Sequence, residues 1–171
     1  MMLGSIYRAQ YKAFRRYTLP TGTTCSVQVG RMICAFGIPP IVGGIVFVTG
    51  LPDGVTGMLP ITLAVIANML MVAFNRLAVW RQTLAKDKSG KYDADKWLID
   101  ATVAHVLAAV SSAIIACVLL CVPVTRAVQG FASMFATHTT ISLLFVLSAL
   151  YAAYVQVNRV DPRVNGNDRT A

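Results

Sequence analysis

Four long hydrophobic stretches dominate the pattern of apolar and polar positions along this chain. The clearest runs from Ala101 to Thr125 without a charged side chain. A helix over that stretch spans about 38 Å, which exceeds the ~30 Å thickness of a hydrocarbon layer. We therefore predict an all-α membrane protein with four transmembrane helices arranged as two hairpins. The transmembrane domain covers 31–158, and its spans run over about 32–51, 55–79, 98–124 and 131–157.

Residues 1–30 have a different pattern, which predicts an amphipathic helix followed by a linker. Met1–Leu19 is too polar for a signal peptide, and its aromatic and aliphatic side chains fall on one side of a helix. Such a helix is expected to lie flat in the membrane interface or, alternatively, to pack against another cytoplasmic element. In the interfacial case, the opposite side contacts anionic lipid headgroups through its basic residues, Arg8, Lys12, Arg15 and Arg16.

The distribution of charge predicts the orientation of the chain. Charged residues make up 13 % of the sequence, with a net charge of +8, against about 25 % charged residues in an average soluble domain. Among the 15 basic residues, only Arg126 falls in either connection on the far side of a four-pass arrangement. This asymmetry indicates that both termini are cytoplasmic, in a plasma or bacterial inner membrane. Anionic lipid is the expected partner of the charge, and nucleic acid is not.

The first span contains a candidate hinge. Pro39 and Pro40 lie in its middle, followed by Gly43 and Gly44. Proline removes a backbone donor and clashes with the preceding turn. The prolines therefore indicate a hinge or broken helix facing a cavity, a tolerated kink, or the first turn of the helix. Pro52-Asp53-Gly54 then predicts a turn that makes spans one and two a tight hairpin.

Polar residues recur along the other three spans. In span two, Asn68 and Asn75 lie on one seam with 4-3 spacing, where they either bond to a neighbouring helix or contact ions. In span three, Ser112 and His105 belong to rows of small residues that should meet another helix, within the chain or from a second copy. Span four carries His138 and Ser142. These six residues are the candidate pore or interhelical polar positions.

The two histidines are expected not to form a shared metal or haem site. His138 is predicted nearer the outer face and His105 nearer the inner face, so their rings should not touch. His105 is interpreted as a hydrogen-bond partner of a neighbouring helix or as a proton sensor. The sequence also has no phosphate-binding loop, nucleophile elbow or paired carboxylates, and no glutamate at all. We therefore expect no enzyme activity, no cofactor and no metal.

These features favour a homo-oligomer with a channel- or pore-like function. Uncharged polar residues at mid-depth fit a membrane-permeabilising effector of the holin or phage-defence type, by analogy of architecture alone. The alternative is a non-conducting scaffold that anchors a cytoplasmic partner at 76–97, including the cytoplasmic loop 80–97. A small-molecule transporter is disfavoured by the missing intramembrane carboxylates. Residues 159–171 are expected to form a polar cytoplasmic tail.

Overall fold

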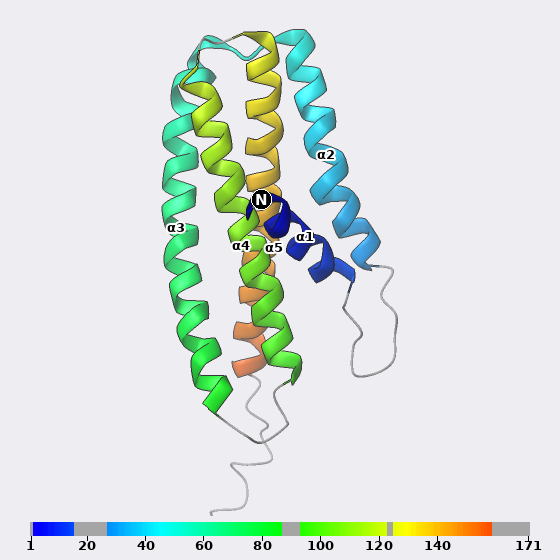
Figure 1. Ribbon diagram of the computed structural model, residues 1–171, viewed down its shortest axis with the longest axis vertical. Helices are drawn as coiled ribbons and strands as arrows, with labels where there is room; N and C mark the ends of the chain where they lie inside the picture. Colours follow the sequence, from blue (N-terminus) through cyan, green and yellow to red (C-terminus); the bar gives the residue numbers. More distant parts are fainter. Residues whose placement is uncertain (1, 16–26, 87–92, 123–124, 159–171) are drawn as a thin grey trace, which may run out of the picture.

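The computed structural model describes residues 2–15, 27–86, 93–122 and 125–158. Regular structure in these ranges is entirely α-helical. The helices are α1 (Met2–Arg15), α2 (Val27–Thr49), α3 (Asp53–Lys86), α4 (Asp93–Leu120) and α5 (Arg126–Asn158), as shown in Figure 1. Four of these helices, α2 to α5, are long and apolar enough to cross a membrane.

The four long helices form an open row rather than a closed bundle. Across the described residues, α3 packs on α4, α4 on α5, and α5 on α2, while α2 contacts neither α3 nor α4. Helix α1 contacts α4 and α2 and lies across the row beside the middle of α4 and α5 (Figure 1). One short helix therefore connects α2 and α4, which do not contact each other in the described part of the chain.

This arrangement differs from the expected pair of hairpins. The turn after α2 is short: Gly50 has a φ of 78°, a left-handed conformation that glycine adopts readily and that ends the helix. Nevertheless, α2 and α3 do not pack against each other, because α4 and α5 lie between them in the row. Two other consecutive pairs of long helices do pack against each other among the described residues: α3 with α4, and α4 with α5.

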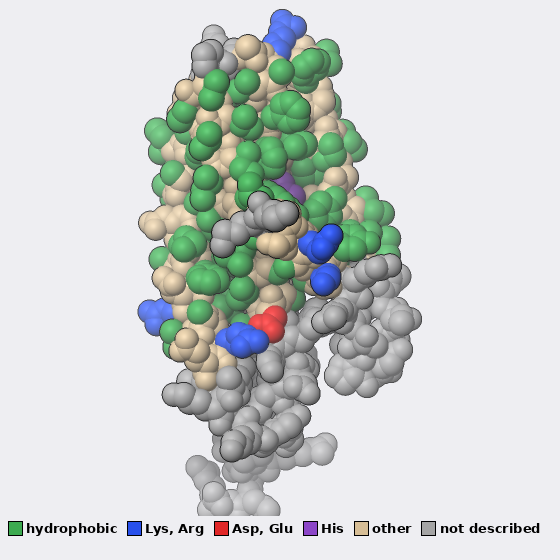
Figure 2. All heavy atoms as spheres, in the orientation of Figure 1, with side chains coloured by type: hydrophobic (Ala, Val, Ile, Leu, Met, Phe, Trp, Pro, Cys, Tyr) green, Lys and Arg blue, Asp and Glu red, His purple; other side chains and the backbone are tan. Residues whose placement is uncertain are grey.

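The outer surface is largely apolar. Large hydrophobic side chains that are more than half exposed are distributed over α2, α3, α4 and α5; examples are Val48, Met58, Ile61, Val118 and Leu144. Figure 2 shows hydrophobic side chains over most of the face in view, with most of its charged side chains in the lower half. That surface suits a lipid solvent, because a soluble protein of this size rarely exposes so continuous an apolar area.

Leucines on one face of α3 form much of the core with α4. Leu63, Leu70 and Leu77 are at most 4 % exposed and recur every seven residues. Leu70 and Leu77 cluster with Val106 and Ile99 of α4, and Leu63 packs against the alanines of the same helix. An ion pair between Arg81 and Asp100 joins the two helices near the end of α3. Both of its side chains are over 40 % exposed, so solvent screens the pair and it adds little to the stability of the fold.

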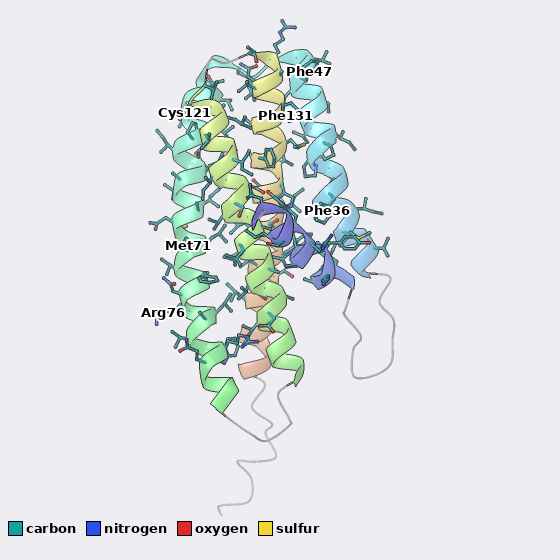
Figure 3. The ribbon with its side chains drawn as sticks, in the orientation of Figure 1. Phe36, Phe47, Met71, Arg76, Cys121 and Phe131 are labelled. Atoms are coloured by element: carbon teal, nitrogen blue, oxygen red, sulfur yellow. The ribbon has the colours of Figure 1, made fainter. Side chains whose placement is uncertain are left out.

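The contact between α2 and α5 depends on two glycines. A Cβ atom added to Gly43 would lie 2.8 Å from the carbonyl oxygen of Gly130, and one added to Gly130 would lie 2.9 Å from the carbonyl oxygen of Gly43. The backbones therefore approach closely, as small residues allow at helix crossings in membranes. Phe47 and Phe131, labelled in Figure 3, lie near this crossing on α2 and α5.

The helix boundaries settle one alternative for the prolines of the first span. Helix α2 begins at Val27 and continues through Pro39 and Pro40 to Thr49, so the helix does not begin at the prolines. Pro39 is buried and Pro40 is exposed. The hinge remains a prediction. The centre of the predicted cytoplasmic loop (87–92), the residue Arg16 and the tail 159–171 lie outside the described residues, as does the side chain of Arg15.

Candidate functional site

The candidate site is a polar cluster where α1 meets α4 and α5. Four of the six polar positions identified in the sequence come together here: His105 and Ser112 on α4, and His138 and Ser142 on α5. Each of them is at most 9 % exposed. Alanines at 104, 108, 109, 113 and 116 of α4 are buried beside them. The small-residue face of the third span therefore meets other helices of the same chain.

A chain of hydrogen bonds runs from α1 through α4 to α5. The Tyr7 hydroxyl lies 2.8 Å from the Ser112 hydroxyl, which lies 2.9 Å from Nδ1 of His138. Each hydroxyl has one hydrogen to donate. Both hydroxyls donate if Tyr7 donates to Ser112 and Ser112 donates to His138. Burial raises the pKa of the Tyr7 phenol above its ordinary range, so this group remains a donor at physiological pH. Tyr7 also contacts the His138 ring edge to face, at 5.5 Å between centroids.

A second set of bonds is centred on Gln10, whose side chain is fully buried. Its amide nitrogen donates to the Ser142 hydroxyl at 3.0 Å and lies 3.4 Å from Nδ1 of His105. Residues 7 and 10 are one helical turn apart, so they present both polar groups on the same face of α1. That face therefore supplies hydrogen-bond partners to the polar side of both α4 and α5.

Aromatic side chains surround this polar centre. Phe14 is 5 % exposed and lies against the rings of His105, Phe36 and Phe145 at centroid distances of 4.7, 6.2 and 5.6 Å. Phe36 of α2 also contacts the His138 ring at 5.8 Å, and Figure 3 labels it at the level of α1. Helix α2 therefore contacts the site through the ring of Phe36, whereas α1 contacts it through hydrogen bonds.

Some buried polar atoms of this region have no hydrogen-bond partner among the residues described. They are Oε1 of Gln10, Nε2 of His138 and Oγ of Ser133. Such atoms are costly in a dry interior and cheaper where water reaches them. Several hydrogen bonds therefore stabilise the cluster, but not every buried polar atom in it has a hydrogen-bond partner.

Both histidines belong to the cluster, although they were expected at different depths. The described contacts join them through α1, since Tyr7 lies beside His138 and Gln10 beside His105. The parts of the chain that the structure describes contain no group of three or more His, Cys, Asp or Glu residues that could hold a metal ion.

Asn68 and Asn75 lie apart from the cluster. Both side chains are exposed on α3, which does not contact α1 in the described part of the chain. Of the residues expected to contact lipid headgroups, Arg8 and Lys12 are exposed.

Sequence reasoning did not identify Tyr7, Gln10 and Phe14 as site residues. Tyr7 and Phe14 were placed on the apolar face of an interfacial helix, and Gln10 was not singled out. A usable signal was the glutamine between Ile6 and Phe14 on that face, because an amide among apolar residues requires a partner. The identity of the partner depends on the three-dimensional arrangement.

Comparison of the chain with protein-family models, with curated proteins and with solved structures finds no match. Its function is therefore argued from its own residues.

Proposed function

We propose that this chain is a membrane-permeabilising, channel-like protein that acts as a homo-oligomer, with both termini in the cytoplasm of a plasma or bacterial inner membrane. The observation that carries the proposal is the buried polar face shared by α4 and α5, formed by His105, Ser112, His138 and Ser142. Hydroxyl and imidazole groups at mid-span can line a hydrated path for ions.

In the arrangement described, α1 covers this polar face. Besides the direct bond between Ser112 and His138, the hydrogen bonds to the side chains of this face come from Tyr7 and Gln10 of α1. Displacement of α1 would leave a groove open on one side and lined by polar groups, since no other described helix takes its place. We therefore assign the arrangement to a closed state, in which α1 acts as the plug.

Two properties of α1 suit a plug better than a permanent structural element. It is short, and its exposed side carries Arg8 and Lys12, whose charges favour the headgroup layer over the hydrocarbon. Its hold on the cluster consists of a few hydrogen bonds and aromatic contacts. Such a helix can exchange between the groove and the interface where the sequence predicted it.

The test is ion flux through liposomes that contain the pure protein. The Gln10→Ala variant loses the bonds to Ser142 and His105, each worth about 0.5–1.5 kcal/mol. If α1 is the plug, the uncovered population and the flux should rise about 5- to 150-fold. The matched control is Lys12→Arg, which changes an exposed residue of the same helix but keeps its charge, and should leave the flux unchanged.

Tight vesicles at high protein loading, for both the natural chain and Gln10→Ala, would contradict the proposal. That result would favour the alternative, a non-conducting scaffold that anchors a cytoplasmic partner through α1 and the 76–97 segment. Equal flux from the natural chain, Gln10→Ala and Lys12→Arg would retain conduction and reject α1 as its plug.

A further inference from the structure

A second set of polar side chains lies on the opposite side of α3 from the core. Asn68 and Asn75 are exposed, and the apolar residues that share their seam are also exposed, from 50 % for Val65 to 68 % for Ile61. We refer to this surface as the asparagine face; it consists of Ile61, Val65, Asn68, Val72 and Asn75. The leucines that pack on α4 point the other way, so the asparagine face is directed away from the rest of the chain.

Neither asparagine side chain has a hydrogen bond within residues 2–15, 27–86, 93–122 and 125–158. Asn68 lies at the midpoint of the candidate membrane span Gly54–Gln82. A carboxamide has two donor hydrogens and an acceptor oxygen, and leaving them unpaired in hydrocarbon is unfavourable. The asparagines therefore indicate that another polar group covers this face in the membrane.

The other features that could drive assembly are occupied within the chain. The small-residue face of α4 packs inside the row of helices, and His138 and Ser142 of α5 bond to α4 and α1. Among the polar seams of the described spans, only that of α3 remains uncovered. An oligomer that pairs polar groups within the membrane therefore has this face to use.

We propose that two copies of this chain pair through the asparagine face, with Asn68 and Asn75 each bonded to its counterpart. Copies inserted with the same orientation present parallel α3 helices, so identical residues meet at the same depth about a two-fold axis. A carboxamide is its own complement, because it both donates and accepts. The seven-residue interval between the asparagines matches the repeat of a left-handed helix pair.

The pairing rests on the oligomeric state proposed above but not on conduction. Since α1 does not contact α3 in the described part of the chain, the polar cluster of each copy lies outside the α3 interface. A dimer of this kind would contain two separate paths, one in each copy.

Disulfide cross-linking in liposomes tests the interface. In a chain whose four cysteines are replaced by alanine, Asn68→Cys should give a covalent dimer on oxidation. The matched control is Leu144→Cys, on α5 and 58 % exposed, which should remain monomeric. A dimer yield for Asn68→Cys no higher than that for Leu144→Cys would overturn the pairing.

A second measurement tests the role of the amides themselves. Replacement of either asparagine by leucine should raise the dimer dissociation constant about 3- to 30-fold, the range expected for one interhelical hydrogen bond in a membrane. Thr62→Leu is the control, because the Thr62 hydroxyl donates to the Met58 carbonyl of its own helix and should not affect pairing. Unchanged dimerisation of Asn68→Leu and Asn75→Leu, measured by energy transfer between labelled copies, would reject the amide pairing.

The two proposals can fail separately. If Asn68→Cys forms the covalent dimer but the vesicles show no ion flux, the interface is retained and conduction is rejected. Ion flux without cross-linking of Asn68→Cys would retain conduction and reject the interface.

Discussion

At the residue scale, a polar group in hydrocarbon must find a partner, and this protein provides partners in two ways. Within the chain, Ser112 lies between Tyr7 and His138, so one hydroxyl connects three helices. On the outer surface, Asn68 and Asn75 have no partner in the described chain, and we assign their partners to a second copy. The need for a hydrogen-bond partner therefore explains both the packing of helices within the chain and the pairing proposed between two copies.

Ser112→Ala should destabilise the fold by about 1–3 kcal/mol, because it leaves the partly buried Tyr7 hydroxyl and the buried His138 Nδ1 without their shared partner. Thr140→Ala is the matched control, since the Thr140 hydroxyl donates to the Ala136 carbonyl of its own helix. Unfolding of the purified variants in detergent, followed by circular dichroism, measures both changes. Equal stability of the two variants would show that the Tyr7–Ser112–His138 chain does not hold α1 in place.

At the element scale, two different surfaces position the helices. Leucines of α3 interlock with α4, whereas α2 is held against α5 by a close approach of Gly43 and Gly130. The sequence predicted four long apolar helices, and the structure has four of that length and character. It did not predict the row, because the short turn after α2 suggested a hairpin with α3. A turn restricts the distance between two helix ends and leaves their choice of packing partner open.

Gly43→Ala should destabilise the contact between α2 and α5 by about 1–3 kcal/mol, because the added methyl group would meet the Gly130 carbonyl oxygen at 2.8 Å and the Met134 Cβ at 3.0 Å. Gly44→Ala should be neutral or slightly stabilising, since no atom lies within 4 Å of the added group. Thermal unfolding in detergent compares these adjacent substitutions. If Gly44→Ala were as unstable as Gly43→Ala, the loss of stability would come from a change in the helix itself and not from the contact between α2 and α5.

At the scale of the whole molecule, the arrangement depends on α1, and here the sequence was least informative. Its alternation of aromatic and basic residues is equally typical of a helix on the membrane surface and of a helix that inserts its apolar face among others. Ser112, His105, His138 and Ser142 were identified as candidate polar positions, but their grouping in one cluster was not. That grouping depends on the register of α4 against α5 and on the gap between α2 and α4, which are properties of the packed chain.

The most direct test of this account is photochemical labelling from α1 in liposomes. A benzophenone side chain in place of Tyr7, which packs against Ser112 and His138, should form cross-links within the chain to α4 or α5 peptides, as identified by mass spectrometry. The same group in place of Tyr11, which is 39 % exposed, should label α4 and α5 far less. Labelling of lipid alone from position 7 would place α1 on the membrane surface and contradict the covered polar cluster on which the account depends.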